Sequence, residues 1–306
     1  MMNSISRFLN SDFFYSFRRA PVAIVSFIVA TTMILLAVLA PLIAPTNPFD
    51  PSTLNLMNGF TAPLDNNEFT GESFLMGTDD QGRDILSTIL FGLRISLFVG
   101  ISAVIFALVL GVILGLSAAM IGGRTDAIIM RIADIQLSFP AILIAMLVFG
   151  IAKGITPPEM RNDVAVWVLI ISIGLADWVQ FARVVRGAAM VELRKEYVEA
   201  ATLIGRGRIA IAARHILPNI LASVLVIATI SLALAIITEA TLSFLGVGAP
   251  PTQPSLGTLI RIGQGFLFSG EWWILLFPSL ALLLLALSVN LLGDWLRNTL
   301  NPKAEH

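Results

Sequence analysis

Six stretches of the sequence are apolar over about twenty residues or more, the length that an α-helix needs to cross a hydrocarbon core of about 30 Å. These stretches are Pro21–Ala44, Ser96–Ala119, Asp126–Ile151, Val164–Val184, Pro218–Ala240 and Trp272–Leu292. Segments that carry most of the prolines and charges separate them. The pattern predicts an all-α polytopic membrane protein with six transmembrane helices.

The composition supports this class and excludes several kinds of site. Of the 306 residues, 57% are hydrophobic and 13% are charged, whereas soluble domains keep about a quarter of their residues charged. A chain without cysteine and with two histidines offers no disulfide, no thiolate ligand and no histidine cluster. The net charge of −1 argues against nucleic acid, which binds basic surfaces. We therefore expect no metal, no other cofactor and no nucleic-acid partner.

Positive charges predict the orientation, because cytoplasmic loops are enriched in lysine and arginine. With the N-terminus inside, the inner segments hold 14 of the 19 Lys and Arg residues and the outer segments hold 5. The predicted organisation is a cytoplasmic segment 1–20, a first helix 21–44, an outer (periplasmic) segment 45–95, a five-helix core 96–295 with an inner loop 185–217, and a cytoplasmic tail 296–306. The first helix is too long for a cleaved signal peptide, so we expect an uncleaved anchor.

Within the predicted spans, two features point to helix packing. Gly111 and Gly115 stand four residues apart, a spacing that lets two helix backbones approach closely, either inside the subunit or at a dimer contact. Pro140 is expected to kink the third span, because its ring removes a backbone hydrogen bond. The kink fits both a fixed bend and a flexible point on a pathway.

Charged residues inside the spans are few, and we expect structural roles for them. Asp134 is predicted to pair with Arg131, one helical turn away. Asp177 and Glu239 lie within about two turns of span ends and are predicted to reach the interface. Carboxylates that cross the membrane as a chain are not found in the sequence, which argues against proton-driven transport.

The outer segment before the second span carries further predictions. Asp84–Gly92 places apolar residues on one helical face, which suggests a helix lying flat in the outer interface. Asp79, Asp80 and Asp84 lack the spacing of a calcium loop, so we expect turn and capping roles for them, with Asp84 paired locally to Arg83. Trp272 and Trp273 are interpreted as anchors at the membrane interface.

The inner loop between the fourth and fifth spans contains a candidate docking helix. Val191–Ile204 has neither proline nor glycine, and Gly205 is expected to end it. Tyr197, Ala200, Ala201 and Ile204 are predicted to share one face. The two alanines allow close approach of another protein and Glu199 offers it a charge. Pro218 is expected to open the fifth span, where its missing N–H costs nothing.

The spacing in this loop resembles a known signature. Glu199-Ala200-Ala201, then Gly205, then Ile216-Leu217-Pro218 is similar to the loop of permease subunits in binding-protein-dependent ABC importers. Further segments resemble the C-type permease of dipeptide and oligopeptide importers. These are Met76–Asp84, Gly122–Asp126, Ser138–Pro140, Ala182–Gly187, Glu239-Ala240 with Leu242–Gly246, and Gly293-Asp294 with Leu296-Arg297.

The resemblance implies a type I ABC importer permease fold, without enzymatic activity, in the cell inner membrane with both termini in the cytoplasm. It implies a second homologous permease subunit as heterodimer partner, two cytoplasmic ATPase subunits and a periplasmic solute-binding protein. Tyr197, Glu199, Ala200, Ala201 and Gly205 are the residues it assigns to ATPase coupling.

The same resemblance puts di- and oligopeptides first among substrates, and nickel, glutathione and opines remain as alternatives. An ATPase-independent secondary transporter or an intramembrane enzyme is the other class considered. Neither internal two-fold repeats nor paired catalytic side chains at membrane depth are found in the sequence to support that class. A phosphate-binding Gly-x-x-x-x-Gly-Lys-Ser/Thr loop is also missing from it, so ATP is expected on a separate chain.

Overall fold

The computed structural model of the chain describes residues 12–50 and 54–300. This part is helical, with two isolated β-bridges that join Asn66 to Ser73 and Thr78 to Asp84. The helices are α2 (Asp12–Arg19), α3 (Pro21–Val38), α4 (Ala40–Ile43), η2 (Leu56–Asn58), α5 (Ile85–Ile121), α6 (Gly123–Leu137), α7 (Ala141–Ile155), η3 (Pro158–Met160), α8 (Arg161–Glu192), α9 (Glu196–Leu203), α10 (Arg208–Ile211), η4 (Ala212–Ile216), α11 (Leu217–Phe244), α12 (Leu256–Gln264) and α13 (Trp273–Leu300).

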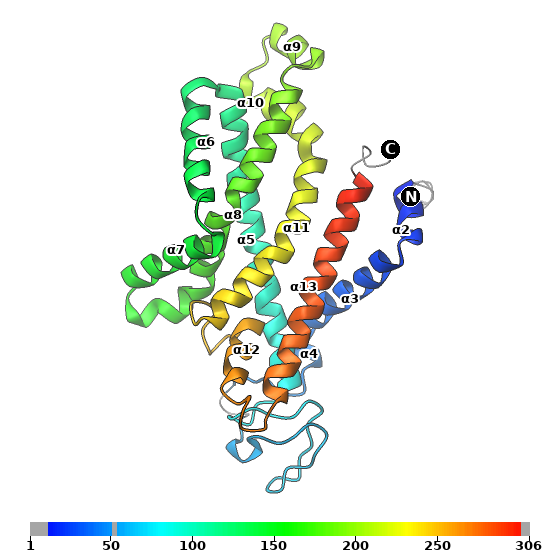
Figure 1. The fold of residues 1–306 in the computed structure, drawn as a ribbon, viewed down its shortest axis with the longest axis vertical. Coiled ribbons are helices and arrows are strands. Elements are labelled where there is room, and N and C mark those ends of the chain that lie inside the picture. The colour runs from blue at the N-terminus through cyan, green and yellow to red at the C-terminus, as the bar shows by residue number, and fades with distance from the viewer. Residues whose placement is uncertain (1–11, 51–53, 301–306) are drawn as a thin grey trace.

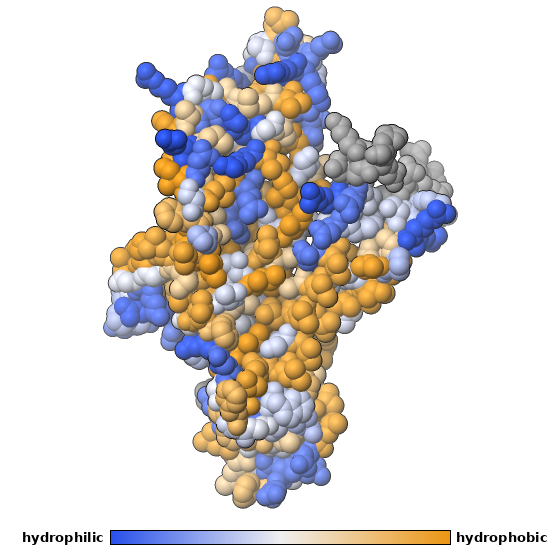
Figure 2. All heavy atoms as spheres, viewed as in Figure 1, coloured by the Kyte–Doolittle hydropathy of each residue, from blue (hydrophilic) through white to orange (hydrophobic). Residues whose placement is uncertain are grey.

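Five helical segments of the described residues are long and apolar enough to cross a membrane, and α6 with α7 forms a sixth candidate only as a bent pair. The five are Pro21–Val38, Ile85–Ile121, Pro158–Glu192, Arg208–Phe244 and Trp273–Thr299. Figure 2 shows apolar side chains over the middle of the visible face and hydrophilic ones gathered toward both ends. The predicted all-α membrane fold is therefore confirmed.

The break between α6 and α7 corrects the third predicted span. Asp126–Ile151 was expected to be one kinked helix, but α6 ends at Leu137 and α7 begins at Ala141, with an angle of 98° between them. Pro140 disfavours helical geometry in the residue before it and has no N–H to donate. It stands as the N-cap of α7, so it starts a new helix in a new direction.

Helix α5 corrects the prediction of a separate interfacial helix over Asp84–Gly92. α5 runs without a break from Ile85 to Ile121, and the Asp84 carboxylate caps it by accepting from the Ser87 N–H at 2.9 Å. The apolar face expected in the interface is buried instead. Ile85, Ile89 and Leu93 belong to a core cluster with residues of α12 and α13. The first turns of α5 are thus held inside the protein.

The small residues of α5 allow close contact with α8 in the same subunit. A Cβ atom on Gly111 would lie 2.8 Å from the carbonyl oxygen of Trp178, and one on Gly115 would lie 2.5 Å from that of Ala182. Neither distance leaves room for a side chain. Of the two interpretations of the glycine spacing, the structure supports packing within the subunit.

The intramembrane carboxylates have other partners than those predicted. Asp134 pairs with Arg183 of α8, not with Arg131; the two partners are 49 residues apart in sequence. Glu239 is fully buried and does not reach the interface. Its carboxylate accepts hydrogen bonds from Ser96 and Ser243, each at 2.7 Å. Glu239 thereby joins α11 to α5.

A cap segment, residues 54–84, folds over one end of the bundle, opposite the end that carries α9 (Figure 1). Arg83 pairs with Asp79 at 2.6 Å and not with Asp84, and both members of the pair are buried. Trp273, predicted as an interface anchor, is also buried, and its indole N–H donates to the Thr78 carbonyl at 3.0 Å. The cap is therefore bonded to the start of α13.

We expect Arg83→Leu to destabilise the cap by about 3 kcal/mol, since it leaves the Asp79 carboxylate buried without its cation. Burial already raises the pKa of Asp79 above its ordinary value, and Arg83 opposes that rise. The unfolding midpoint of the purified protein in detergent measures the loss. The double variant Asp79→Asn with Arg83→Leu is the control and should recover part of it. A single variant as stable as the wild type would contradict the prediction.

Candidate functional site

The candidate site is the connection between α8 and α11, which carries α9 at one end of the bundle (Figure 1). The predicted helix Val191–Ile204 is divided here. α8 continues to Glu192, and α9 covers Glu196–Leu203. Between them Lys195 is extended, with φ −85° and ψ 145°. This change of direction lets Val198 and Ala201 of α9 join the main hydrophobic core.

One tyrosine fastens α9 to both neighbouring helices. The Tyr197 hydroxyl donates to the carboxylate of Glu192, in the last turn of α8, and accepts from the Asn219 amide of α11 at 3.1 Å. Lys195 donates to the other oxygen of Glu192 at 2.7 Å. Burial raises the pKa of the Tyr197 hydroxyl and the bond to Glu192 raises it further, so the phenol stays protonated. α9 is thus attached to α8 and α11 at a single point.

The end of α9 is set by backbone geometry at Gly205. Its φ is +82°, a left-handed conformation that glycine adopts without cost. The Gly205 N–H bonds to the Thr202 carbonyl at 2.9 Å and the Arg206 N–H to the Ala201 carbonyl at 3.1 Å. This pair of bonds is a Schellman motif. The predicted helix stop at Gly205 is confirmed, and its role in coupling stays a prediction.

The exposed surface of α9 differs from the predicted face. Tyr197 and Ala201 turn toward the body of the protein, whereas Ala200 and Ile204 face outward, as does Glu199. The four residues therefore do not form one docking face. The tip is apolar and open instead, because Leu203, Ile204 and Ile209 are 88%, 80% and 86% exposed. We call Leu203, Ile204 and Ile209 the exposed tip.

The helix that follows begins where Pro218 predicted it. α11 covers Leu217–Phe244 with Pro218 in its first turn, where a missing N–H costs nothing. The apolar helical stretch extends further back, to Arg208, through α10 and a π-helical turn over Ala212–Ile216. A widened turn there accommodates a residue that has no N–H to donate to the preceding turn.

Sequence reasoning missed several residues of this site. Glu192 and Asn219 hold Tyr197, and the distance of 22 residues between Tyr197 and Asn219 gives no local signal. Leu203 and Ile209 complete the exposed tip, and their apolar side chains in a basic loop were the available sign. Within the described residues, His, Asp and Glu side chains are not grouped in threes that would hold a metal ion. The site is an exposed apolar tip on a short helix that is bonded to two long ones.

Comparison with known proteins identifies the family. The family model for the binding-protein-dependent transport system inner membrane component matches residues 107–306. A second model, for the N-terminal transmembrane domain of oligopeptide transport permease C, matches residues 9–63. Together the two models cover the first helix and most of the helical core, including the connection between α8 and α11.

Curated relatives are similar over nearly the whole chain. The dipeptide transport system permease protein of Haemophilus influenzae is 36% identical over 292 residues, 95% of this chain and 94% of that protein. The dipeptide permease of Escherichia coli K12 is 37% identical over 292 residues, with 95% and 92% covered. The oligopeptide permease of Bacillus subtilis is 36% identical over 293 residues, with 95% and 89% covered. The chain therefore belongs to the family of binding-protein-dependent transport system inner membrane components.

Proposed function

We propose that this chain is a permease subunit of an ABC importer that moves di- and oligopeptides into the cytoplasm. The relatives named above are dipeptide and oligopeptide permeases, which favours peptides over nickel, glutathione or opines. The subunit pairs with a second, homologous permease. Two cytoplasmic ATPase subunits and a periplasmic solute-binding protein complete the transporter. The chain itself does not hydrolyse ATP.

The observation that carries this proposal is the way α9 is mounted. Its exposed tip is free to enter a groove on a soluble partner, and Glu199 beside it supplies a charge. Its inner side is fixed to α8 and α11 through Tyr197. A rigid element that is attached to two helices transmits displacement to them, whereas a flexible loop absorbs it.

The mechanism follows from this attachment. The end with α9 faces the cytoplasm, in agreement with the excess of positive charges in that loop, and the cap faces the periplasm. When ATP closes the two ATPases on each other, they move α9. α8 and α11 move with it, and the pathway between the two permease subunits changes its opening from the cytoplasm to the loaded binding protein.

Uptake of a labelled dipeptide into proteoliposomes tests the proposal. The vesicles hold this chain, its permease partner, the ATPases and the binding protein. We expect accumulation with ATP and a fall to background when the ATPases are left out or inactivated in their ATP site. Vesicles with the inactive ATPases control for assembly. Uptake that persists without ATP hydrolysis would identify a secondary transporter and overturn the proposal.

A further inference from the structure

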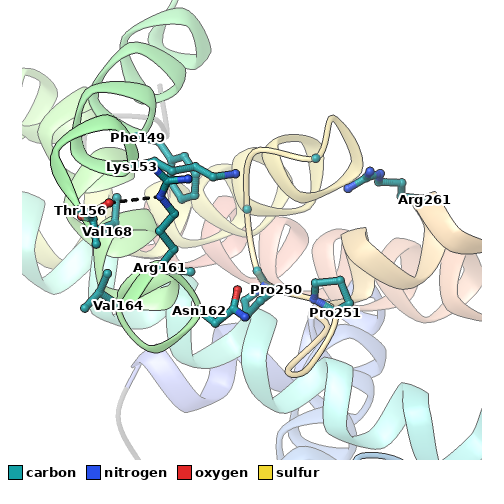
Figure 3. A pocket seen from close by; sticks show the side chains of 14 residues that line it. Phe149, Lys153, Thr156, Arg161, Asn162, Val164, Val168, Pro250, Pro251 and Arg261 are labelled. Atoms are coloured by element: carbon teal, nitrogen blue, oxygen red, sulfur yellow. Dashed lines mark hydrogen bonds between the residues drawn. The ribbon is translucent and has the colours of Figure 1, made fainter. Parts of the chain in front are cut away.

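A cavity of about 300 Å³ lies on the half of the molecule that carries the cap, between the α7–α8 hairpin, the loop 246–251 and α12 (Figure 1). Three cations line it: Lys153 from the last turn of α7, Arg161 from the start of α8, and Arg261 from α12. In Figure 3, Lys153 and Arg261 point toward each other from opposite sides of the cavity, with Arg161 on the side of Lys153. The α7–α8 hairpin and α12, which is distant from it in sequence, thus place positive charge in one space.

A backbone hydrogen bond holds one of these cations, and a glycine leaves space for another. The Arg161 Nε donates to the Thr156 carbonyl at 3.2 Å, which leaves its terminal nitrogens free of that bond. The Arg261 guanidinium lies against Gly246, where a Cβ atom would come within 2.8 Å of Nη1. Gly246 also has a φ of +81°, a conformation that favours glycine. Both the backbone conformation and the nearby guanidinium therefore suit a residue without a side chain.

The cations have no carboxylate among the residues that line the cavity. Within the described residues, none of the three is in an ion pair shorter than 4.0 Å. Glu159 and Asp163 are close in sequence, but both are exposed and neither lines the cavity. Like charges that converge without a counterion repel one another and attract an anion.

The distribution of charge over the chain makes this cluster unusual. The proposed orientation leaves five Lys and Arg residues outside, and Arg83 is already paired with Asp79. Three of the remaining four line this one cavity. The positive-inside rule explains why outer segments have few Lys and Arg residues. It does not explain why three of these few residues converge on one cavity.

We propose that this cavity binds the C-terminal carboxylate of the peptide during its transfer from the outer side. Guanidinium groups suit a carboxylate, because their N–H groups match its two oxygens. Phe149, Val168, Pro250 and Pro251 supply apolar walls for the neighbouring side chain. The carboxylate is shared by all unmodified peptides, so it permits recognition without sequence preference. The inference rests on the proposed peptide transport.

Uptake of labelled alanyl-alanine and of its C-terminal amide by the complete reconstituted transporter tests the site. Each variant is compared with the wild type for both compounds, so any preference of the unchanged binding protein cancels. We expect Arg261→Gln to lower uptake of the acid about tenfold, the effect of losing a charged hydrogen bond, and to change uptake of the amide far less. Lys153→Gln should act in the same direction. Arg261→Lys should retain most of the uptake.

Arg94→Gln is the matched control, because Arg94 is an exposed outer cation that does not line this cavity; it should alter neither compound. Equal losses for acid and amide would overturn the inference. Two other results would also overturn it, each together with an unchanged ratio of acid to amide uptake. One is loss of bound anionic lipid in native mass spectrometry. The other is weaker stimulation of ATP hydrolysis by the peptide-free binding protein. Wild-type vesicles that take up neither compound would overturn the proposed function itself.

Discussion

Replacing Gly205 by valine is expected to abolish ATP-driven uptake while the chain remains folded and inserted in the membrane. The left-handed backbone at Gly205, with φ +82°, costs a residue with a side chain about 1–2 kcal/mol, and a β-branched one is disfavoured further. No atom lies within 4 Å of the position that a Cβ would take, so the effect comes from the backbone alone. The Schellman motif would open and the exposed tip would lose its shape.

Gly207→Val is the control for this variant. Gly207 also has open space around it, but its φ of −65° suits any residue. The two variants therefore add the same side chain two residues apart and differ in backbone strain. Uptake into proteoliposomes and co-purification of the ATPases are the measurements. Normal uptake by the Gly205→Val variant would contradict the proposed role of α9 in coupling.

Gly111→Leu is expected to prevent accumulation of folded protein, which is a different failure from loss of coupling. The new side chain would start 2.8 Å from the Trp178 carbonyl oxygen, a backbone atom that cannot turn away. α5 and α8 would have to separate, and with them a core that includes Phe181 and Val185. Overpacking costs about 1–3 kcal/mol even where side chains can adjust, and here they cannot.

Gly150→Leu provides the comparison, because Gly150 lies in α7 and has open space where a Cβ would stand, with no atom within 4 Å. The amount of monodisperse protein extracted from membranes, followed by gel filtration, measures both variants. We expect Gly150→Leu to resemble the wild type. Gly111→Leu protein of normal yield that fails only to bind the second permease would instead place Gly111 at the subunit interface.

The features predicted correctly from the sequence are those decided by neighbouring residues. Gly205 ends α9 because a helix stop depends on a few positions, and Gly111 with Gly115 marks a close packing face because a four-residue spacing does so in any helix. The apolar stretches predicted the long helices for the same reason. At Pro140 a break in the helix was predicted at the right residue, but its strength was misjudged, because the proline divides the span into two helices.

Two of the predictions that failed concern partners far apart in sequence. Asp134 was assigned the nearest arginine on its own helix, whereas the tertiary fold gives it Arg183. Glu239 was expected at the interface because it lies near the end of its span, but its hydroxyl partner Ser96 lies 143 residues away in sequence. Periodicity describes one helix at a time, so it contains no information on which helices become neighbours. The cavity with three cations was hidden for the same reason.

In the proposed mechanism, the hydrogen bonds that Tyr197 makes to two helices limit how those helices can move. One hydroxyl joins the end of α8 to the start of α11, because it bonds to both Glu192 and Asn219. A displacement of α9 therefore reaches both helices. Moving one of them alone would break a hydrogen bond worth about 1 kcal/mol, so the contact favours coordinated movement of the two helices.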